Sequence, residues 1–269
     1  MSASDPASKS EPFTELCTHS NTTIHYRNAN LVDDILGRKS FTEVLFSQIT
    51  NREATKEDLR LIDAVLIAIM EHGLTPSAIS TRLVYMSAPE NLQGAVAAGL
   101  LAVGSQFIGT VENCALNLEE IIADPAGIEA ASERIAQDYR RRKASIPGFG
   151  QHLHKPDDPR AAKLIAIGRE HPHAVGKHLD AIEALSKAVV KAAGKHITIN
   201  ATGAVAALLG ELQIPSQLMR GFAVISRAAG LVAHIAEEQR QPTGRHIWKL
   251  IDESIPYRGT GQGRDKPHA

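Results

Sequence analysis

Apolar residues recur at helical spacing along most of the chain. Between residues 59 and 70 they follow the three- and four-residue steps of one helix face, and Gly73 suits the C-terminal stop of that helix. The stretches Ser40-Phe41-Thr42-Glu43 and Thr55-Lys56-Glu57-Asp58 are typical helix starts, because a hydroxyl oxygen and an acid three residues later satisfy free amide groups. The same patterns predict further helices over residues 92–122, as a pair, and over 128–143, 160–170, 178–194, 202–212 and 218–238.

Strand-like alternation of apolar and polar residues is not convincing in any segment. Aromatic residues make up only 4% of the chain while alanine, leucine and isoleucine abound, and this balance favours helices packed on helices over a sheet core. The sequence therefore predicts an all-α protein. Residues 1–12 are expected to form a disordered leader, and residues 259–269 a loose tail.

Charge and composition argue against several classes of protein. The net charge of −1 gives no overall attraction to nucleic acid or to an anionic membrane surface, and no apolar run reaches the length of a membrane span. The polar residues 1–15 lack the apolar core of a signal sequence. Cys17 and Cys114 have neither the spacing of metal ligands nor the density of a disulfide framework. We expect a cytoplasmic protein without nucleic-acid or membrane partners.

The most informative motif lies in residues 148–160, which read G-F-G-Q-H-L-H-K-P-D-D-P-R. It resembles the signature loop of the citrate synthase and citryl-CoA lyase superfamily, whose members make or break a carbon–carbon bond between an acyl-CoA and a 2-oxo acid. The resemblance extends from about residue 23 to residue 248, and the length matches the compact lyase-type members. Further elements resembling the family are Glu71–Ser77 before Arg82, Ala97–Leu100, Asn200–Ala204 and Ser226–His234.

The resemblance implies a dicarboxylate site made of His72, Arg160 and Arg227. Its physical basis is sound, because a planar guanidinium group grips a carboxylate through two parallel charge-assisted hydrogen bonds. The alternative is that the two arginines only cap helices or pair with Asp157 or Glu237.

The residues that the family uses for proton transfer are replaced in this chain. The resemblance aligns Phe107 with the first catalytic histidine, Gln151 with the second, and Thr202 with the aspartate base. An amide and a hydroxyl can donate hydrogen bonds, but neither acts as a general base near neutral pH. These replacements argue against ordinary citrate synthesis.

Two histidines next to Gln151 are candidates for the missing acid or base. Imidazole titrates near neutral pH, so His152 or His154 can move a proton while Gln151 donates a hydrogen bond to the substrate oxygen. The alternative is that both are surface histidines without a role. A metal site with Asp157 and Asp158 is a weaker interpretation, because a His-x-His spacing alone is not specific. No metal is expected.

The basic run Arg140-Arg141-Arg142-Lys143 directly precedes the signature loop. Positive charge at a helix C-terminus complements the helix dipole, and this alone accounts for the run. The resemblance offers a second interpretation, in which Arg141 and Lys143 attract the phosphates of coenzyme A.

The resemblance also implies an architecture. A large helical domain is expected to combine residues 13–118 with 223–258, and a small helical domain, 119–222, to close over a cleft. A homodimer or higher homo-oligomer is expected, with Arg240 or Arg245 reaching the partner's site.

The leading functional hypothesis is an enzyme that makes or breaks a carbon–carbon bond in a polycarboxylate acyl-CoA, similar to citryl-CoA lyase, by lyase or acyl-transferase chemistry. Coenzyme A enters as the thioester of the substrate. One alternative is a carboxylate lyase, hydratase or isomerase of the same fold that does not need coenzyme A. Another is a non-catalytic paralogue that only binds carboxylates.

Overall fold

A computed structural model describes residues 12–104, 109–151, 153–172 and 175–258. The chain forms two compact units, residues 1–62 and 63–269, and each is described here by itself. Both borders of the predicted small domain, near residues 119 and 222, fall inside the second unit, and that division stays a prediction.

The first unit begins with a small antiparallel sheet in the order β1-β2-β3. Its strands are β1 (Cys17–His19), β2 (Ile24–Tyr26) and β3 (Ala29–Asn30). The expectation that no strand would form is wrong here, because strands of two or three residues are too short to show alternation. A π-helical turn, η1 (Leu31–Ile35), and helix α1 (Phe41–Thr50) follow, together with the first half of α2 (Lys56–Met70).

The two predicted helix starts in this unit are confirmed. Ser40 Oγ accepts from the amide of Glu43, and the Glu43 carboxylate accepts from the amide of Ser40, which completes a capping box. Thr55 and Asp58 make the same reciprocal pair of hydrogen bonds at the start of α2.

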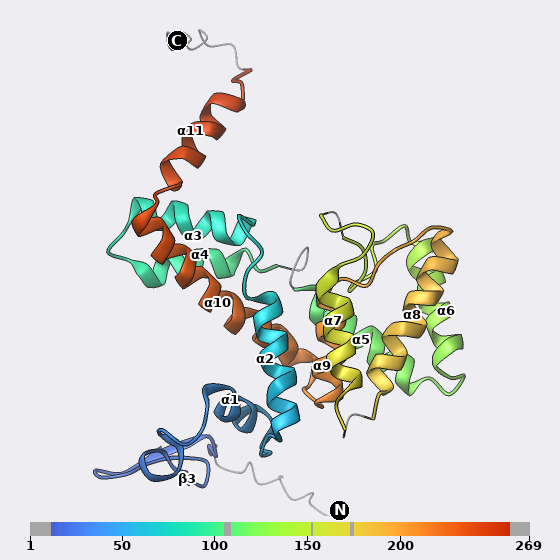
Figure 1. Cartoon of the computed structure of the whole chain (residues 1–269), viewed down its shortest axis with the longest axis horizontal. Coiled ribbons are helices and arrows are strands. Elements are labelled where there is room, and N and C mark those ends of the chain that lie inside the picture. The colour runs from blue at the N-terminus through green and yellow to red at the C-terminus, as the bar shows by residue number, and fades with distance from the viewer. Residues whose placement is uncertain (1–11, 105–108, 152, 173–174, 259–269) are drawn as a thin grey trace, which may run out of the picture. The chain divides into compact units, whose positions relative to one another are not determined.

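The second unit contains the rest of α2 and a series of further helices (Figure 1). They are α3 (Pro76–Ser87), α4 (Leu92–Leu101), α5 (Thr110–Ala123), α6 (Ile128–Arg141), α7 (Pro159–Arg169), α8 (Lys177–Ala193), α9 (Ala201–Glu211), α10 (Ser216–Arg240) and α11 (Gly244–Ser254). The fold is all-α apart from the small sheet, as predicted. Helices α3 and α11 were not predicted; Pro76 occupies the first turn of α3 behind the N-cap Thr75.

The core of the second unit lies around α9. Its residues are almost all small or branched apolar side chains, and they are buried against α5, α7 and α8. A helix that is apolar on every side needs such an environment. Helix α10 contacts α9 and α5 and also the separate pair α3 and α4, so it runs through both groups of helices (Figure 1).

Helix α10 is long and apolar enough to cross a membrane by length and hydropathy alone. Half of that stretch is buried inside the protein, and its buried face holds Ser226, Arg227 and His234 in contact with other helices. This pattern is typical of the core helix of a helical protein.

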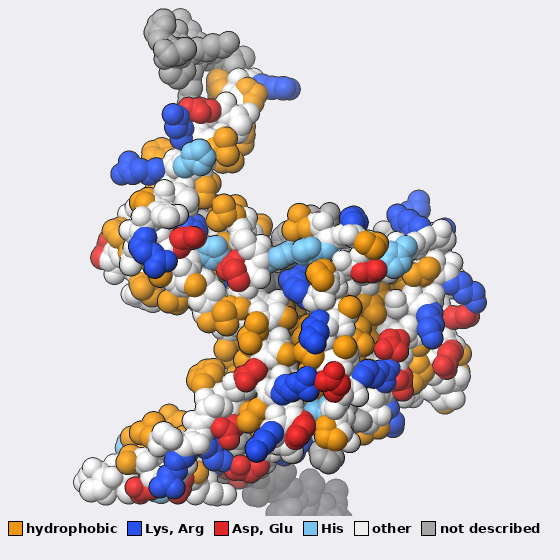
Figure 2. Space-filling view, in the orientation of Figure 1, with side chains coloured by type: hydrophobic (Ala, Val, Ile, Leu, Met, Phe, Trp, Pro, Cys, Tyr) orange, Lys and Arg blue, Asp and Glu red, His pale blue; other side chains and the backbone are white. Residues whose placement is uncertain are grey.

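Helix α11 contacts α3 and leaves most of its apolar side chains exposed. Hydrophobic and charged side chains lie side by side on its surface in Figure 2, and the exposed apolar residues include Trp248, Leu250 and Ile251. The helix is strongly amphipathic but, within the described part of the chain, has no second helix against its apolar side.

Candidate active site

A cavity of about 1060 Å³ opens where seven segments of the second unit meet. They are the segment from the end of α2 to the start of α3, the residues just after α4, the start of α5, the signature loop with the residues just before it, and parts of α7, α9 and α10. Polar residues that line the cavity include His72, Thr75, Thr110, Gln151, Arg160, Asn200, Thr202 and Arg227. The sequence-predicted carboxylate ligands therefore share one cavity with Gln151.

The signature loop is held tightly against the start of α9. Gly148 has a φ of +85°, and a Cβ atom there would lie 2.5 Å from Cys114 Sγ and 2.9 Å from Gly203 Cα, so only glycine fits. The amide of Gly150 donates to Thr198 O, and the amide of Asn200 donates to Gly148 O. These contacts fix the backbone from which Gln151 projects.

Asp158 is the central anchor of the site. This buried carboxylate is the N-cap of α7 and accepts hydrogen bonds from the amide of Ala201 at 3.1 Å and from Gln151 Nε2 at 3.4 Å. Arg160 completes the set with a bidentate pair, Nε to Oδ1 at 3.0 Å and Nη2 to Oδ2 at 2.9 Å. Burial alone would raise the pKa of Asp158, but the contacts with Arg160 outweigh it and lower the pKa to about 2.

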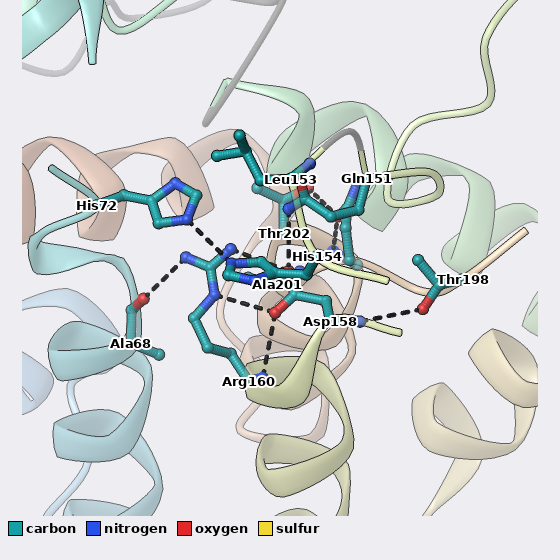
Figure 3. A network of polar contacts seen from close by, with 12 residues as sticks. Ala68, His72, Gln151, Leu153, His154, Asp158, Arg160, Thr198, Ala201 and Thr202 are labelled. Carbon is teal, nitrogen blue, oxygen red and sulfur yellow. Dashed lines mark hydrogen bonds and ion pairs between the residues drawn. The ribbon is translucent and has the colours of Figure 1, made fainter. Parts of the chain in front are cut away.

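Arg160 therefore does not pair with Asp157, which contacts His196 instead. The Nε edge of its guanidinium group is occupied by Asp158, while Nη1 lies 3.5 Å from Ala68 O (Figure 3). The end of the guanidinium group formed by its two Nη atoms remains in position for a ligand carboxylate.

Arg227 is a buried cation without a bidentate carboxylate partner. Its Nη1 donates to Thr75 Oγ1 at 3.2 Å and its Nη2 to Ile69 O at 3.3 Å, while Nε has no hydrogen-bond partner among the described residues. Burial lowers its pKa; Glu71 opposes this shift and Arg160 adds to it. A buried guanidinium next to a second cation favours an anion in the cavity. The alternative pairing with Glu237 is wrong, because Glu237 contacts Arg82.

His72, which lines the cavity, is in contact with His154. Their Nε2 atoms lie 3.2 Å apart and their ring centroids 5.4 Å apart, and the two rings point toward one another (Figure 3). One nitrogen must donate and the other accept, so at least one ring is neutral. Burial lowers the pKa of His72, as do Arg160, His154 and Arg227, while Asp158 opposes the shift. His152 lies outside the described residues, as does Phe107.

Other residues that line the cavity carry neutral polar groups. Thr202 Oγ1 donates to Asn200 Oδ1 at 2.7 Å, so the 2.8 Å contact between the hydroxyls of Thr110 and Thr202 has Thr110 as donor. Gln151 Oε1 accepts from the amide of Leu153. Sequence reasoning missed Thr110 and Thr75; the only local signal for Thr75 was its place before Pro76.

A second cavity of about 700 Å³ adjoins the first behind the signature loop, and both are lined by Ser145, Ile146, Phe149 and Gly150. Three basic residues line it: Arg140, Lys143 and Lys195. Arg141, the other predicted phosphate ligand, is not among its lining residues and pairs with Asp138 at 2.5 Å. Of the two residues that the sequence analysis grouped as phosphate ligands, only Lys143 lines this cavity, and Arg141 does not.

Comparisons with known proteins agree with this geometry. The family described as citrate synthase, C-terminal domain, matches residues 5–249. ATP-citrate synthase beta chain protein 1 of Arabidopsis thaliana is 22% identical over 71% of this chain and 34% of its own length. Putative citrate synthase 2 of Mycobacterium tuberculosis is 24% identical over 78% of this chain and 54% of its own length. The chain therefore spans between a third and about half of these curated relatives.

Comparison with solved structures also finds similar folds among citryl-CoA lyase and citrate synthase. Citryl-CoA lyase from Hydrogenobacter thermophilus superimposes with a TM-score of 0.82 at 29% identity, and the match covers 96% of this chain and 98% of the lyase. Citrate synthase from Thermotoga maritima shares the fold, with a TM-score of 0.65 at 24% identity over 86% of this chain and 60% of its own. The fold, the signature loop and the family match over residues 5–249 together show that this chain belongs to the citrate synthase family.

Proposed function

We propose that the protein is a lyase of the citryl-CoA lyase type, which cleaves a carbon–carbon bond in a polycarboxylate acyl-CoA. The observation that carries the proposal is that Arg160, Arg227 and His72 line one cavity and that His154 contacts His72. Two related solved structures support this substrate class: an ATP citrate lyase from Methanosaeta concilii holds citryl-CoA, and one from Methanothrix soehngenii holds citrate and coenzyme A.

The carboxylates of the substrate bind to the cationic residues of the cavity. The free end of the Arg160 guanidinium group takes one carboxylate, while the guanidinium group of Arg227 and the imidazole of His72 take another. A bound anion also removes the repulsion between the two guanidinium groups.

Cleavage needs one proton to leave the substrate hydroxyl and one to reach the departing carbon. His154 takes the hydroxyl proton, Gln151 donates a hydrogen bond to the oxygen as it becomes a carbonyl, and the carbon–carbon bond breaks. The electron pair of that bond passes to the methylene carbon next to the thioester, which then accepts the proton that His154 took from the hydroxyl, and the imidazole returns to its neutral form. The 3.4 Å contact between Gln151 and Asp158 is long enough to be exchanged for one with the substrate.

The coenzyme A part of the substrate extends into the second cavity. Arg140, Lys143 and Lys195 have no carboxylate partner among the described residues, so their charge is available to phosphate groups. This proposal keeps Lys143 from the sequence prediction and replaces Arg141 by Arg140 and Lys195.

A homodimer is part of the proposal. The exposed apolar side chains of α11, which include Trp248 and Ile251, are suited to packing against a second copy. Whether Arg240 or Arg245 reaches a partner's site remains a prediction.

A second candidate function rests on the uncharged polar residues that line the cavity. Since Thr110, Thr202 and Asn200 offer hydroxyl and amide groups only, a carboxylate lyase, hydratase or isomerase that forms no thioester enolate would also suit this site. Such an enzyme would not use the second cavity.

Calorimetric titration of oxaloacetate and of citrate, each with and without coenzyme A, separates these functions when the recovered samples are checked for turnover by mass spectrometry. Binding that tightens with coenzyme A supports the lyase. Binding that is indifferent to coenzyme A favours the second candidate or a non-catalytic carboxylate-binding protein, and turnover decides between those two. The absence of any binding overturns the proposal.

A further inference from the structure

His72 lies on a segment that one face of α10 holds in place. The contacts come from four residues along that face: Ser226, Arg227, Gly230 and His234. At Gly230 the two backbones are so close that a Cβ atom would lie 2.2 Å from Met70 O. The position of the segment therefore depends on α10, and the last of these contacts is the one nearest to His72 in sequence.

Glu71 connects His72 to α10. One carboxylate oxygen, Oε1, accepts from the amide of His72 at 2.8 Å, and the other, Oε2, lies 2.8 Å from His234 Nε2. Burial alone would raise the pKa of Glu71, but the contacts with His234 and the His72 amide lower it below its ordinary value, aided by Arg227. Glu71 is thus an ionised carboxylate that accepts from the His72 amide and lies against the His234 ring.

The hydrogen bonds of His234 fix its tautomer. Arg82 Nε lies 3.0 Å from His234 Nδ1, and a guanidinium group can only donate, so Nδ1 must accept. The ring proton is then on Nε2, on the side of Glu71, although the Nε2 to Glu71 contact is off the ideal N–H direction.

Arg82 cannot easily turn away from His234. It is 2% exposed, and it also donates to Glu238 Oε2 at 2.9 Å, to Thr243 Oγ1 at 3.1 Å and to Glu237. The orientation of His234 is therefore determined by a buried arginine that uses four of its five N–H donors in contacts with His234, Glu238, Thr243 and Glu237.

We propose that Glu71 and His234 are positioning residues that hold His72 where it can bind a substrate carboxylate. The role of His72 rests on the proposed function. The positioning itself does not, because it is a property of the ligand-free chain.

The fixed tautomer makes one substitution decisive. In Glu71→Gln, the amide oxygen can accept from the His72 amide, but the amide NH₂ then faces the Nε2–H of His234, so two donors meet. If the amide turns over, the oxygen faces His234 and the His72 amide loses its acceptor. Glutamine therefore cannot replace glutamate here, even though it has the same size and shape.

The test compares Glu71→Gln, Glu71→Ala and the control Glu237→Gln. Glu237 also contacts Arg82 but has no contact with His72 or His234. We expect both Glu71 variants to bind citrate about tenfold more weakly than the unchanged protein, because His72 is displaced. In steady-state rates with citryl-CoA, the KM should change more than the kcat. In the ligand-free protein, hydrogen exchange at the His72 amide should accelerate in both. Glu237→Gln should change neither quantity. Glu71 is on the surface, so these variants are expected to fold.

A second measurement concerns the tautomer directly. Nitrogen-15 NMR of the histidine rings should show His234 protonated at Nε2 and unprotonated at Nδ1. His234→Gln, whose amide can accept from Arg82 and donate to Glu71, should retain most of the citrate affinity that His234→Ala loses.

Unchanged His72 exchange and unchanged citrate affinity in Glu71→Gln would overturn the inference, and so would a proton on His234 Nδ1. If the unchanged protein binds no citrate, the proposed function fails, whereas the exchange and NMR results still decide whether Glu71 and His234 position His72.

Discussion

Two sets of residues at the cavity differ in the kind of polar group they offer. The cationic set consists of Arg160, Arg227 and His72, which line the cavity, and of His154, which contacts His72. The neutral set, Thr110, Thr202 and Asn200, supplies only hydroxyl and amide groups. The chemistry of the cationic set suits an anion and a proton transfer, whereas that of the neutral set suits an uncharged part of a ligand.

The difference indicates which part of the reaction has been kept. Binding of carboxylates needs fixed cations, and Arg160 and Arg227 supply them. Proton transfer to carbon in the cleavage direction needs a proton donor, and the hydroxyl and amide groups of Thr110, Thr202 and Asn200 do not serve as acids near neutral pH. We infer that proton transfer depends on the histidine pair His72 and His154.

The largest effect is expected from Arg160→Ala. It removes a carboxylate ligand and leaves Asp158 buried without its partner, so citrate affinity should fall about a hundredfold or more, with a lower melting temperature. Calorimetry and thermal unfolding measure both. Lys163→Ala, which removes an exposed cation from the same helix, is the matched control; an equal loss of affinity there would show that only the net charge matters.

His154→Ala should lower kcat by about a hundredfold and leave citrate affinity within a few-fold, because the imidazole moves a proton and does not carry the carboxylate. The control is His196→Ala, which removes an exposed histidine that contacts Asp157. Steady-state rates with citryl-CoA measure the effect. If kcat stays unchanged in His154→Ala, the histidine pair is not the source of catalysis.

Binding of a carboxylate should be linked to proton uptake. The pKa of His72 is lowered in the ligand-free protein, and a bound anion beside Arg160 and Arg227 favours the imidazolium, so the complex holds more protons. Affinity should therefore rise as pH falls through the window between the free and bound pKa values, by at most about tenfold per pH unit for one proton. Calorimetry with oxaloacetate in two buffers of different ionisation enthalpy counts the protons. Release of protons on binding, or no change in the number of bound protons, would contradict this account.

The smallest effect is expected from Thr202→Val. It removes a hydroxyl from the neutral set of residues while keeping the shape of the side chain, and kcat should fall by no more than about tenfold, since a hydroxyl orients but does not accept a proton. A loss of activity as large as in His154→Ala would show that the essential proton transfer depends on Thr202 and not on the histidine pair alone.

The helices and the signature loop could be predicted because their signals are local. The capping residues Ser40 and Thr55, and the glycines of residues 148–150, specify structure within a few positions, and the structure confirms them. Helix α3 was missed although Thr75 and Pro76 form a local helix start, with Thr75 as the N-cap and Pro76 in the first turn.

The contacts that define the site could not be predicted in the same way. His72 and His154 are separated by 82 positions and Arg82 and His234 by 152, and nothing local in the sequence relates them. The pairing of Arg160 with Asp158 rather than Asp157 depends on which carboxylate caps α7, which neighbouring aspartates do not reveal from the sequence.

Incubation of the protein with citryl-CoA, followed by mass spectrometry of the thioester and acid products, tests the central claim most directly. The account predicts conversion to acetyl-CoA and oxaloacetate that disappears in His154→Ala and in Arg160→Ala but persists in His196→Ala and Lys163→Ala. Citryl-CoA that remains intact with the unchanged protein, or cleavage that survives both of the first two substitutions, would contradict it.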